Sequence, residues 1–487
     1  MRSKFNFRFI FKTLGFLLII ESICLMIASL IAFYQDEGCG DAIVVSGAIT
    51  FVSGILLTIL GTEEIEQKVG KRESFLVVAL SWTVMSAFGM LPYYLSGEIT
   101  NISDAYFETM SGFSSTGATI LQNIDGMSKS LLFWRSLTQW IGGIGIIVFA
   151  LVLLPMVGGN ASILYEAEAS GIVKMRLRPR IGQMAKRLFM CYLLLTTVLV
   201  VLLWLGPMNL FDSICHALAG ISTGGFSTKQ ASIAYWDSAY VEYVLSIFMF
   251  IGGVNFALIY YLLQGVANKL VEDEEFRWYL TICGIFTLIV AFGVIVSGTI
   301  DDIEQAFRTS LFSVVSVITT TCFTTTDYTA WGSFYTFIFA LLMPFCACAG
   351  STSGGMKIVR LVVLCKNAIN EFKRQVHPNA ILPVRLNGNV VSTDVVTKIL
   401  AFMFLYLGIT ALSAVVLSAT GMGLEESVGS AISCMSNTGL AFDRHGMSDG
   451  YANIPVFSKW YMSFLMLTGR LEIFTVLSLF MPGFWQK

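Results

Sequence analysis

The dominant pattern along the chain is a series of long apolar runs separated by shorter polar segments. A helix needs about 20 apolar residues to cross the hydrocarbon core of a bilayer, which is roughly 30 Å thick. Ten runs approach or exceed that length, at residues 9–34, 41–61, 74–97, 131–157, 187–205, 238–265, 279–298, 333–356, 398–420 and 456–480. The pattern therefore predicts an all-α protein that crosses a membrane many times.

Four short polar stretches interrupt this pattern at related places. They read SSTGAT at 114–119, STGGFST at 222–228, TTTCFTTTD at 319–327 and SNTGLAFD at 436–443. Each follows a segment of helix length and lies between two apolar runs. Recurrence at a spacing of roughly a hundred residues indicates an internal repeat, with landmarks at Gly117, Gly224, Cys322 and Gly439.

The repeating unit is a helix, a short helix with its polar stretch, and a second helix. We predict four such units around one pseudo-fourfold pore, at residues 71–165, 186–266, 277–372 and 396–487. Residues 1–70 stand outside the repeat and are predicted to form two extra N-terminal transmembrane helices. The basic start would suit a signal peptide, but the apolar run continues to Tyr34 without a cleavage site, so we expect a retained helix.

Composition supports a membrane protein and disfavours enzymes. Charged residues make up 13% of the chain and hydrophobic residues 55%, with a mean hydropathy of +0.74, whereas about a quarter of the residues in soluble proteins are charged. The ten cysteines lie mostly inside apolar runs without metal-ligand spacing, which is typical of small buried hydrophobic residues. With three histidines and no acid pair at membrane depth, an intramembrane enzyme is not expected.

Two further classes fit the pattern poorly. A secondary transporter for an organic solute would show inverted repeats and two broken helices, whereas the four units here run in the same direction. The chain contains no phosphate-binding loop, so we expect no organic cofactor in it. Nucleic acid is not an expected partner either.

Basic residues predict the orientation of the chain in the membrane. When ten spans are threaded, the basic connections and both termini fall on one side, which is therefore predicted to be cytoplasmic. The basic residues on this side include Arg2, Lys4, Arg8, Lys12, Lys68, Lys71, Arg72, Lys174, Arg176, Arg178, Arg180, Lys186, Arg187, Lys269, Arg277, Lys357, Arg360, Lys366, Lys373, Arg374, Arg385 and Lys398. The opposite side is predicted to be acidic and to attract cations, with Asp36, Glu37, Asp104, Glu108, Asp212, Asp237, Asp301, Asp302, Glu304, Glu425, Glu426 and Asp449.

The four polar stretches imply a common aqueous axis. Non-helical backbone survives at membrane depth only inside protein or beside water, because each unpaired peptide group in lipid costs several kcal/mol. Glycine accepts positive φ without a Cβ clash, and four short helices that point their C-terminal ends at one axis favour a cation. Rings of carbonyl oxygens replace the hydration shell of potassium. The alternative for a single stretch is tight re-entrant packing, which four equivalent copies disfavour.

The order of these parts resembles the Trk/Ktr/HKT superfamily of potassium transporters, in particular its bacterial TrkH type. The motifs that carry the resemblance are TGAT at 116–119, STGGFST at 222–228, TTTCFTTTDY at 319–328 and SNTGLAF at 436–442. The resemblance covers nearly the whole chain, including the two extra leading spans. It implies potassium uptake across the bacterial inner membrane, one pore per subunit, a homodimer surrounded by membrane lipid, and a cytosolic nucleotide-binding regulator of the TrkA type.

The resemblance also implies an ion selectivity filter. Its residues would be Thr116, Gly117, Thr223, Gly224, Thr321, Cys322, Thr438 and Gly439, with the potassium ion held at the carbonyl groups of the four threonines. Cys322 departs from the family, in which this position is usually glycine. A Cβ at a left-handed backbone position costs about 1 to 2 kcal/mol. A sodium-permeable or cation-coupled transporter of the same fold therefore stays open as an alternative.

The eighth apolar run is interrupted by CACAGSTSGGMKIVR at 346–360. Its three glycines would break the helix at membrane depth, which requires a water-lined setting; a close helix crossing through small residues is the alternative. The resemblance implies that an intramembrane loop obstructs the pore at this point. The gate residues would be Gly350, Ser351, Thr352, Ser353, Gly354, Gly355 and Lys357.

Arg470 lies near the middle of the last apolar run. A charge at that depth is expensive and must face protein or water. As the resemblance implies, we predict a pore-facing arginine that repels cations when the gate is shut. An ion pair with Glu472 is the alternative, although a spacing of two places that residue on another face of a helix.

Overall fold

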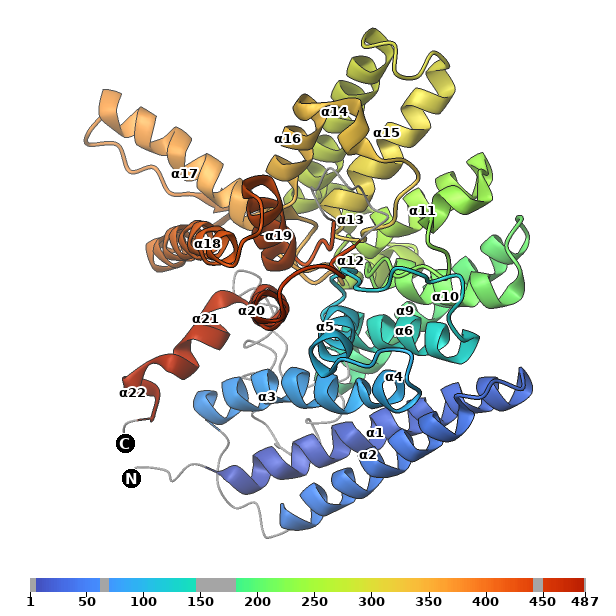
Figure 1. The fold of residues 1–487 in the computed structure, drawn as a ribbon. Coiled ribbons are helices and arrows are strands. Elements are labelled where there is room, and N and C mark those ends of the chain that lie inside the picture. Colours follow the sequence, from blue (N-terminus) through green and yellow to red (C-terminus); the bar gives the residue numbers. More distant parts are fainter. Residues whose placement is uncertain (1–5, 62–69, 146–180, 441–449, 486–487) are drawn as a thin grey trace.

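The computed structural model describes residues 6–61, 70–145, 181–440 and 450–485, which are nearly all helical (Figure 1). Within these residues, six helices are long and apolar enough to cross a membrane, or eight if each of two bent helix pairs counts as one span. The six are α1 (Phe7–Tyr34), α2 (Gly40–Leu60), α3 (Lys71–Gly89) continued by α4 (Leu91–Leu95), α9 (Ile181–Trp204), α14 (Glu274–Val296) and α18 (Thr393–Ala419). The predicted all-α membrane fold is confirmed.

The remaining elements are helices, short 3-10 turns and two small sheets. The helices are α5 (Ile102–Phe113), α6 (Lys129–Gly143), α10 (Leu210–Ile221), α11 (Ala239–Gly252), α12 (Phe256–Leu263), α13 (Asn268–Glu272), α15 (Ile303–Ile318), α16 (Ser333–Leu342), α17 (Ile358–Val376), α19 (Leu424–Ser436), α20 (Val456–Arg470), α21 (Ile473–Leu477) and α22 (Pro482–Trp485). The 3-10 turns are η2 (Ser232–Trp236), η3 (Tyr328–Trp331) and η5 (Ser478–Phe480). Strand β1 (Phe345–Cys346) pairs in parallel with β2 (Met356–Lys357), and β3 (Arg385–Leu386) pairs antiparallel with β4 (Asn389–Val390).

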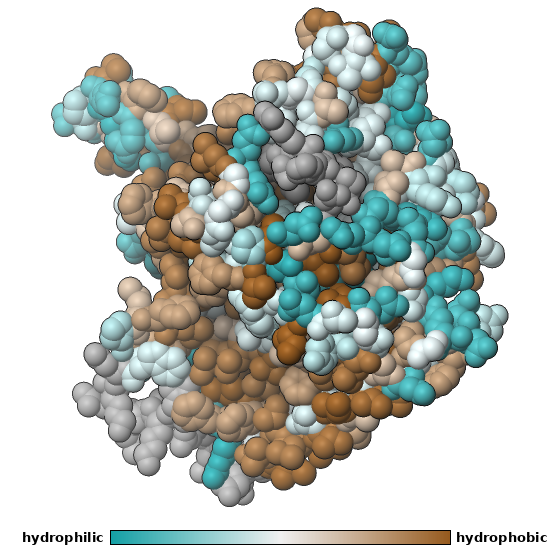
Figure 2. All heavy atoms as spheres, in the orientation of Figure 1, coloured by the Kyte–Doolittle hydropathy of each residue, from teal (hydrophilic) through white to brown (hydrophobic). Residues whose placement is uncertain are grey.

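The first two helices form a layer at one side of the molecule. Helices α1 and α2 lie side by side; α1 contacts α3 and α6, and α2 contacts α4 (Figure 1). Figure 2 shows a broad hydrophobic surface over this region. Among the large exposed apolar side chains of the two helices are Ile23, Leu30, Phe33, Val52 and Ile59. Apolar surface of this extent suits contact with lipid.

A short helix precedes each of the four polar stretches, as the sequence pattern predicts. These helices are α5, α10, α15 and α19, of 12, 12, 16 and 13 residues, too short to cross a bilayer at about 1.5 Å per residue. Asn101, Asn209 and Asp302 begin three of them, each accepting a hydrogen bond from a first-turn amide. Such N-caps stabilise a helix start by about 1 kcal/mol, so the local sequence defines where the short helices begin.

The apolar runs after the second, third and fourth polar stretches are bent or interrupted helices. The chain bends by 109° between α11 and α12 and by 117° between α20 and α21, so the apolar runs predicted at 238–265 and 456–480 each form a bent helix pair. Glycines near the ends of the helices that follow the polar stretches pack closely against the short helices. A Cβ on Gly142 would overlap the carbonyl oxygen of Phe113 at the end of α5.

Two more glycines occupy the same kind of position. A Cβ on Gly469 would overlap the carbonyl oxygen of Met435 at the end of α19, and one on Gly252 would lie 3.2 Å from that of Ile221 at the end of α10. In the third unit the helix stops earlier, since α16 ends at Leu342 and α17 begins at Ile358. The predicted break near 346–360 is therefore present.

Several predictions from the sequence fall outside the described residues. Residues 146–180 include the end of the fourth predicted run and the basic residues from Lys174 to Arg180. Residues 62–69 include Lys68, and residues 441–449 include the end of the fourth polar stretch and Asp449. Arg2 and Lys4 lie in residues 1–5.

The contact between α1 and α2 predicts how the protein will respond to a single methyl group. A Cβ on Gly15 would lie 2.6 Å from the carbonyl oxygen of Gly54. We expect Gly15→Ala to push the helices apart and to destabilise the protein by about 1 to 3 kcal/mol, measured as a lower unfolding temperature in detergent. The control is Gly284→Ala in α14, where nothing lies within 4 Å of the added methyl. Equal unfolding temperatures for the two variants would contradict the prediction.

Candidate functional site

The four short helices end in the same way, and this common ending builds the site. After each helix one residue adopts a left-handed backbone, and a second does so two positions later. The first residues are Ser115, Thr223, Thr320 and Asn437, with φ between 53° and 59°; the second are Gly117, Gly225, Cys322 and Gly439, with φ between 66° and 84°. The amide between them always donates to a carbonyl five residues earlier, at 2.8–2.9 Å, in the pairs Thr116–Ser111, Gly224–Ala219, Thr321–Ser316 and Thr438–Ser433.

This ending corrects the register of the second polar stretch by one residue. The sequence comparison matches Thr223 and Gly224 with Thr116 and Gly117, because both pairs read Thr-Gly. In the structure Gly224 occupies the place of Thr116, and Gly225, with a φ of 78°, occupies the place of Gly117. Two consecutive glycines left the register ambiguous, and the local resemblance favoured the wrong one.

The polar stretches converge, each with carbonyl oxygens against a glycine of its neighbour. An added Cβ would overlap a carbonyl oxygen of the next stretch in three places, namely Gly117 with Gly224, Gly225 with Thr321 and Gly439 with Thr116. The fourth stretch therefore lies beside the first, the first beside the second, and the second beside the third. Thr116, Thr321 and Thr438 are buried. The arrangement gathers backbone oxygens from distant parts of the chain and leaves no room for side chains.

Cys322 is the exception, because it carries a side chain in this crowded place. Its Cβ lies 2.8 Å from the ideal Cβ positions of both Gly117 and Gly225. Its Sγ atom is 3.8 Å from the carbonyl oxygen of Gly117. The thiol therefore lies where the first three stretches converge. Among the described residues no group of histidine, cysteine and acidic side chains could hold a metal ion.

A buried ion pair that the sequence analysis missed supports the first two stretches. Arg135 Nε lies 2.7 Å from Glu108 Oε1, and both side chains are almost fully buried. Glu108 also accepts hydrogen bonds from the hydroxyl of Thr119 and the amide of Ile120, both at 3.0 Å. Arg135 donates to the carbonyl of Ser227 at 3.0 Å. Glu108, listed from the sequence among the acids of the non-cytoplasmic side, is thus buried and paired. The missed signal was an arginine inside an apolar run, which needs a partner.

His216, on the short helix α10, has a structural environment. It is buried, with Nδ1 2.8 Å from the carbonyl of Asp212 and Nε2 2.9 Å from the hydroxyl of Ser227. Both ring nitrogens have partners, so the histidine helps hold the second polar stretch against its helix.

The segment between α16 and α17 lies against the ends of the short helices. The hydroxyl of Thr352 donates to the carbonyl of Ile221 at 3.0 Å, and the amide of Gly354 donates to the hydroxyl of Thr320 at 3.2 Å. One carboxylate oxygen of Glu275 joins the two ends of the segment. It accepts hydrogen bonds from the amides of Ala349 at 2.7 Å and Val359 at 3.2 Å. The segment is thus folded by hydrogen bonds directly beside the polar stretches.

Two cations hold the segment. Lys357 Nζ lies 3.0 Å from the hydroxyl of Ser353, 3.3 Å from the carbonyl of Gly354 and 3.4 Å from the hydroxyl of Ser351. Arg470 ends α20 at the bend and donates to the carbonyl of Thr352 at 2.6 Å. These contacts fold the segment around the lysine and tie it to the last helix pair.

Arg470 also reaches the first unit, where it donates to the carbonyl of Gly142 at 2.8 Å. The alternative partner considered from the sequence, Glu472, forms its ion pair with Arg360 at 2.6 Å. Arg470 therefore joins three backbone segments that meet near the polar stretches.

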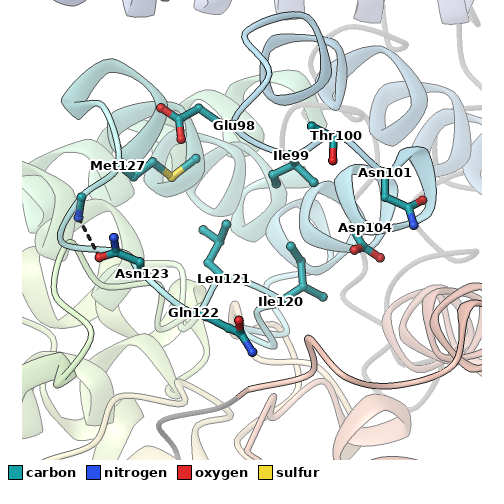
Figure 3. Close-up of a pocket in the computed structure, with 11 residues that line it drawn as sticks. Glu98, Ile99, Thr100, Asn101, Asp104, Ile120, Leu121, Gln122, Asn123 and Met127 are labelled. Carbon is teal, nitrogen blue, oxygen red and sulfur yellow. Dashed lines mark hydrogen bonds between the residues drawn. The ribbon is translucent and has the colours of Figure 1, made fainter.

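A polar pocket of about 330 Å³ lies between the start of α5 and the residues that follow the first stretch (Figure 3). Glu98, Asp104, Gln122 and Asn123 contribute carboxylate and amide groups to its wall. Asp104 is held by Lys459, 2.7 Å away. The pocket lies toward the N-terminal end of α5, the end predicted to face the acidic side of the membrane.

Comparison with known proteins relates this geometry to a family. The family model of TrkH, described as a cation transport protein, matches residues 39–487. The chain is 36% identical to the Trk system potassium uptake protein TrkH of Escherichia coli (strain K12), over 99% of this chain and all of the relative. It is 31% identical to the Trk system potassium uptake protein TrkG of the same organism, over 97% of each chain.

A solved structure agrees with these matches. The crystal structure of the potassium transporter TrkH from Vibrio parahaemolyticus matches with a TM-score of 0.90 and 32% identity, covering 99% of this chain and all of that one. Fold and relatives together define a multi-pass membrane transport protein, not an enzyme. The chain belongs to the TrkH family of cation transport proteins, and the resemblance carried by its polar stretches is confirmed.

Proposed function

We propose that this chain takes up potassium across the bacterial inner membrane through a filter formed by its four polar stretches. The observation that carries the proposal is the shared ending of α5, α10, α15 and α19, which brings carbonyl oxygens of successive stretches together. Carbonyl oxygens replace the hydration shell of potassium, and each helix C-terminus adds about half a negative charge. The relatives named as Trk system potassium uptake proteins support the choice of ion.

The filter residues follow from the corrected register. The carbonyl groups that would bind potassium belong to Thr116, Gly224, Thr321 and Thr438, and the left-handed positions that orient them are Gly117, Gly225, Cys322 and Gly439. Thr223, given in the sequence analysis as a ligand, is the left-handed residue that follows the C-cap Ser222 of α10 and would contribute through its position before Gly224.

The assembly remains a prediction. The word "system" in the names of the relatives supports a protein that works with other components. We expect a homodimer with a cytosolic nucleotide-binding regulator of the TrkA type, and both termini on the cytoplasmic side. Measuring the mass of the purified complex with and without such a regulator would test the assembly.

The gate is proposed to be the segment from Gly350 to Lys357 with Arg470. It lies against the C-terminal ends of α10 and α15, where an ion leaving the filter would emerge. The ammonium of Lys357 and the guanidinium of Arg470 bring positive charge to this place. A nearby fixed charge raises the barrier for potassium by a few kcal/mol where water is scarce, on the order of the Coulomb energy at an effective dielectric of 20.

Permeability to sodium is the second candidate, and the position of Cys322 favours it. A side chain among the filter carbonyls makes the contributions of the four polar stretches unequal. Carbonyl groups placed unequally around the ion match the size of potassium less well. Coupling of transport to a second cation stays open beside channel-like flux.

The filter is tested by Gly225→Ala. The added methyl would overlap the carbonyl oxygen of Thr321, so we expect loss of potassium uptake in a transport-deficient bacterium, with normal amounts of protein in the membrane. Gly265→Ala is the matched control, because Gly265 has a φ of 81° but nothing within 4 Å of its added methyl. Both changes cost about 1 to 2 kcal/mol of backbone strain, yet only Gly225→Ala should stop uptake. Growth of Gly225→Ala on low potassium would reject the filter.

The role of Cys322 is tested by Cys322→Gly. Removing the side chain relieves the left-handed strain at a φ of 66° and makes the third corner like its neighbours. We expect a higher ratio of potassium to sodium permeability, measured as competing ion fluxes into liposomes. An unchanged or lower ratio would show that the cysteine is a tolerated equivalent of glycine.

The gate is tested by Arg470→Ala, which removes both the charge and the hydrogen bonds to the carbonyls of Thr352 and Gly142. We expect higher rubidium flux into liposomes without any regulator. Arg470→Lys keeps the positive charge but loses the simultaneous hydrogen bonds to the two carbonyls. It therefore separates the electrostatic effect of the charge from the effect of holding the two segments together. If Arg470→Ala conducts like the parent protein, the barrier lies elsewhere and the arginine is structural.

A further inference from the structure

The second polar stretch lacks a side chain that the other three possess. In those three, the threonine beside the left-handed position pairs its hydroxyl with the hydroxyl that ends the short helix. The pairs are Ser114 with Thr116 at 2.7 Å, Thr319 with Thr321 at 2.6 Å, and Ser436 with Thr438 at 2.7 Å. In the second stretch the corresponding residues are Ser222 and Gly224, and glycine offers no hydroxyl.

The amide of Gln139 fills the space that a threonine side chain would occupy at Gly224. An ideal Cβ on Gly224 would lie 2.6 Å from Gln139 Oε1 and 2.8 Å from its Nε2. The amide also bonds to the stretch on both sides, since Nε2 donates to the carbonyl of Gly224 at 2.7 Å and Oε1 accepts from the amide of Phe226 at 3.0 Å. Gln139 is fully buried.

The equivalent positions on other helices carry no such amide. Gln139 lies three residues before Gly142, the glycine that packs on the end of α5. Three residues before the corresponding glycines, Gly252 and Gly469, the chain has Met249 and Met466. The polar amide therefore occurs on the helix that faces the stretch without its own hydroxyl.

Neighbouring contacts fix the residues around the amide. One turn earlier on α6, the guanidinium of Arg135 lies over the ring of Phe226 at 3.9 Å. The hydroxyl of Ser115 approaches the carbonyl of Gln139 at 3.4 Å. Gln139 thus contacts the first polar stretch through its backbone carbonyl and the second through its side-chain amide.

We propose that Gln139 is a positioning residue that sets the direction of the Gly224 carbonyl in place of the missing threonine. The inference rests on the proposed potassium filter. A carbonyl oxygen has two lone pairs, so one can accept from Gln139 while the other faces an ion. Without the amide, the two adjacent glycines are free to rotate this carbonyl away, and one corner of the filter loses its ligand.

The test exchanges the amide for the threonine it replaces. Gln139→Ala should lower the ratio of potassium to sodium permeability in liposomes by about fivefold or more, the effect of losing one or two hydrogen bonds. Gly224→Thr alone should also lower the ratio, because its side chain would collide with the amide. The double variant Gln139→Ala with Gly224→Thr should recover to within about twofold of wild type, since the new hydroxyl can pair with Ser222.

A second readout keeps the test valid without transport. The unfolding temperature of each purified variant should fall for both single changes and recover in the double variant. Wild-type protein that passes no potassium would reject the proposed function. In that case the unfolding temperatures alone would still test whether Gln139 packs against Gly224 in place of a threonine. Recovery of stability with an unchanged permeability ratio in Gln139→Ala would make Gln139 a space-filling residue and overturn the positioning role. A double variant that recovers neither property would overturn the exchange itself.

Discussion

Backbone that is not helical must find hydrogen-bond partners or water when it lies at membrane depth, and the rest of this structure depends on that constraint. Each short helix stops inside the protein, so its last carbonyls and the following residues need partners in the dry interior. Left-handed residues such as Ser115 turn the chain so that the next amide bonds back into the helix. Glycines in the helices that follow the polar stretches, such as Gly142, come close enough to pack against the last carbonyls of the short helices. The bends in the long helices are consequences of that close packing.

Charges in the interior follow the same logic. Taking an arginine out of water is expensive unless a partner and further hydrogen bonds replace the solvent. Arg135 has Glu108 and a backbone carbonyl, and Arg360 has Glu472 and the ring of Phe402 at 3.8 Å. Arg470 donates to backbone carbonyls of two distant segments, at Thr352 and Gly142.

The four polar stretches share the same backbone conformation but differ in their side chains. Each difference is accompanied by a change in the neighbouring residues. The third carries a thiol where its neighbours have glycine. The second lacks a hydroxyl and receives an amide from α6. The third unit also ends its helix early and folds the segment from 343 to 357 against its neighbours. In the proposed filter, substitutions at these positions would therefore change one polar stretch at a time.

The sequence by itself determined the architecture, because length and periodicity of apolar runs report directly on burial in a membrane. It predicted the helical spans, the four short helices with their polar stretches, the break after α16 and the family. N-caps such as Asn101 and Asn209 explain why those short helices begin where they do. Each of these features depends on residues close together in the chain.

Tertiary structure decided the features that depend on contacts between distant segments. Whether Gly224 or Gly225 takes the left-handed position depends on packing against distant residues. Gln139 lies 85 residues before Gly224, and Thr321 lies 96 residues after Gly225. The bend after Gly252 depends on the end of α10, and the burial of Glu108 depends on Arg135, 27 residues later. A local pattern records the polarity and size of a residue. It does not record which segment lies beside it, and that neighbour determines which carbonyl, hydroxyl or charge finds its partner.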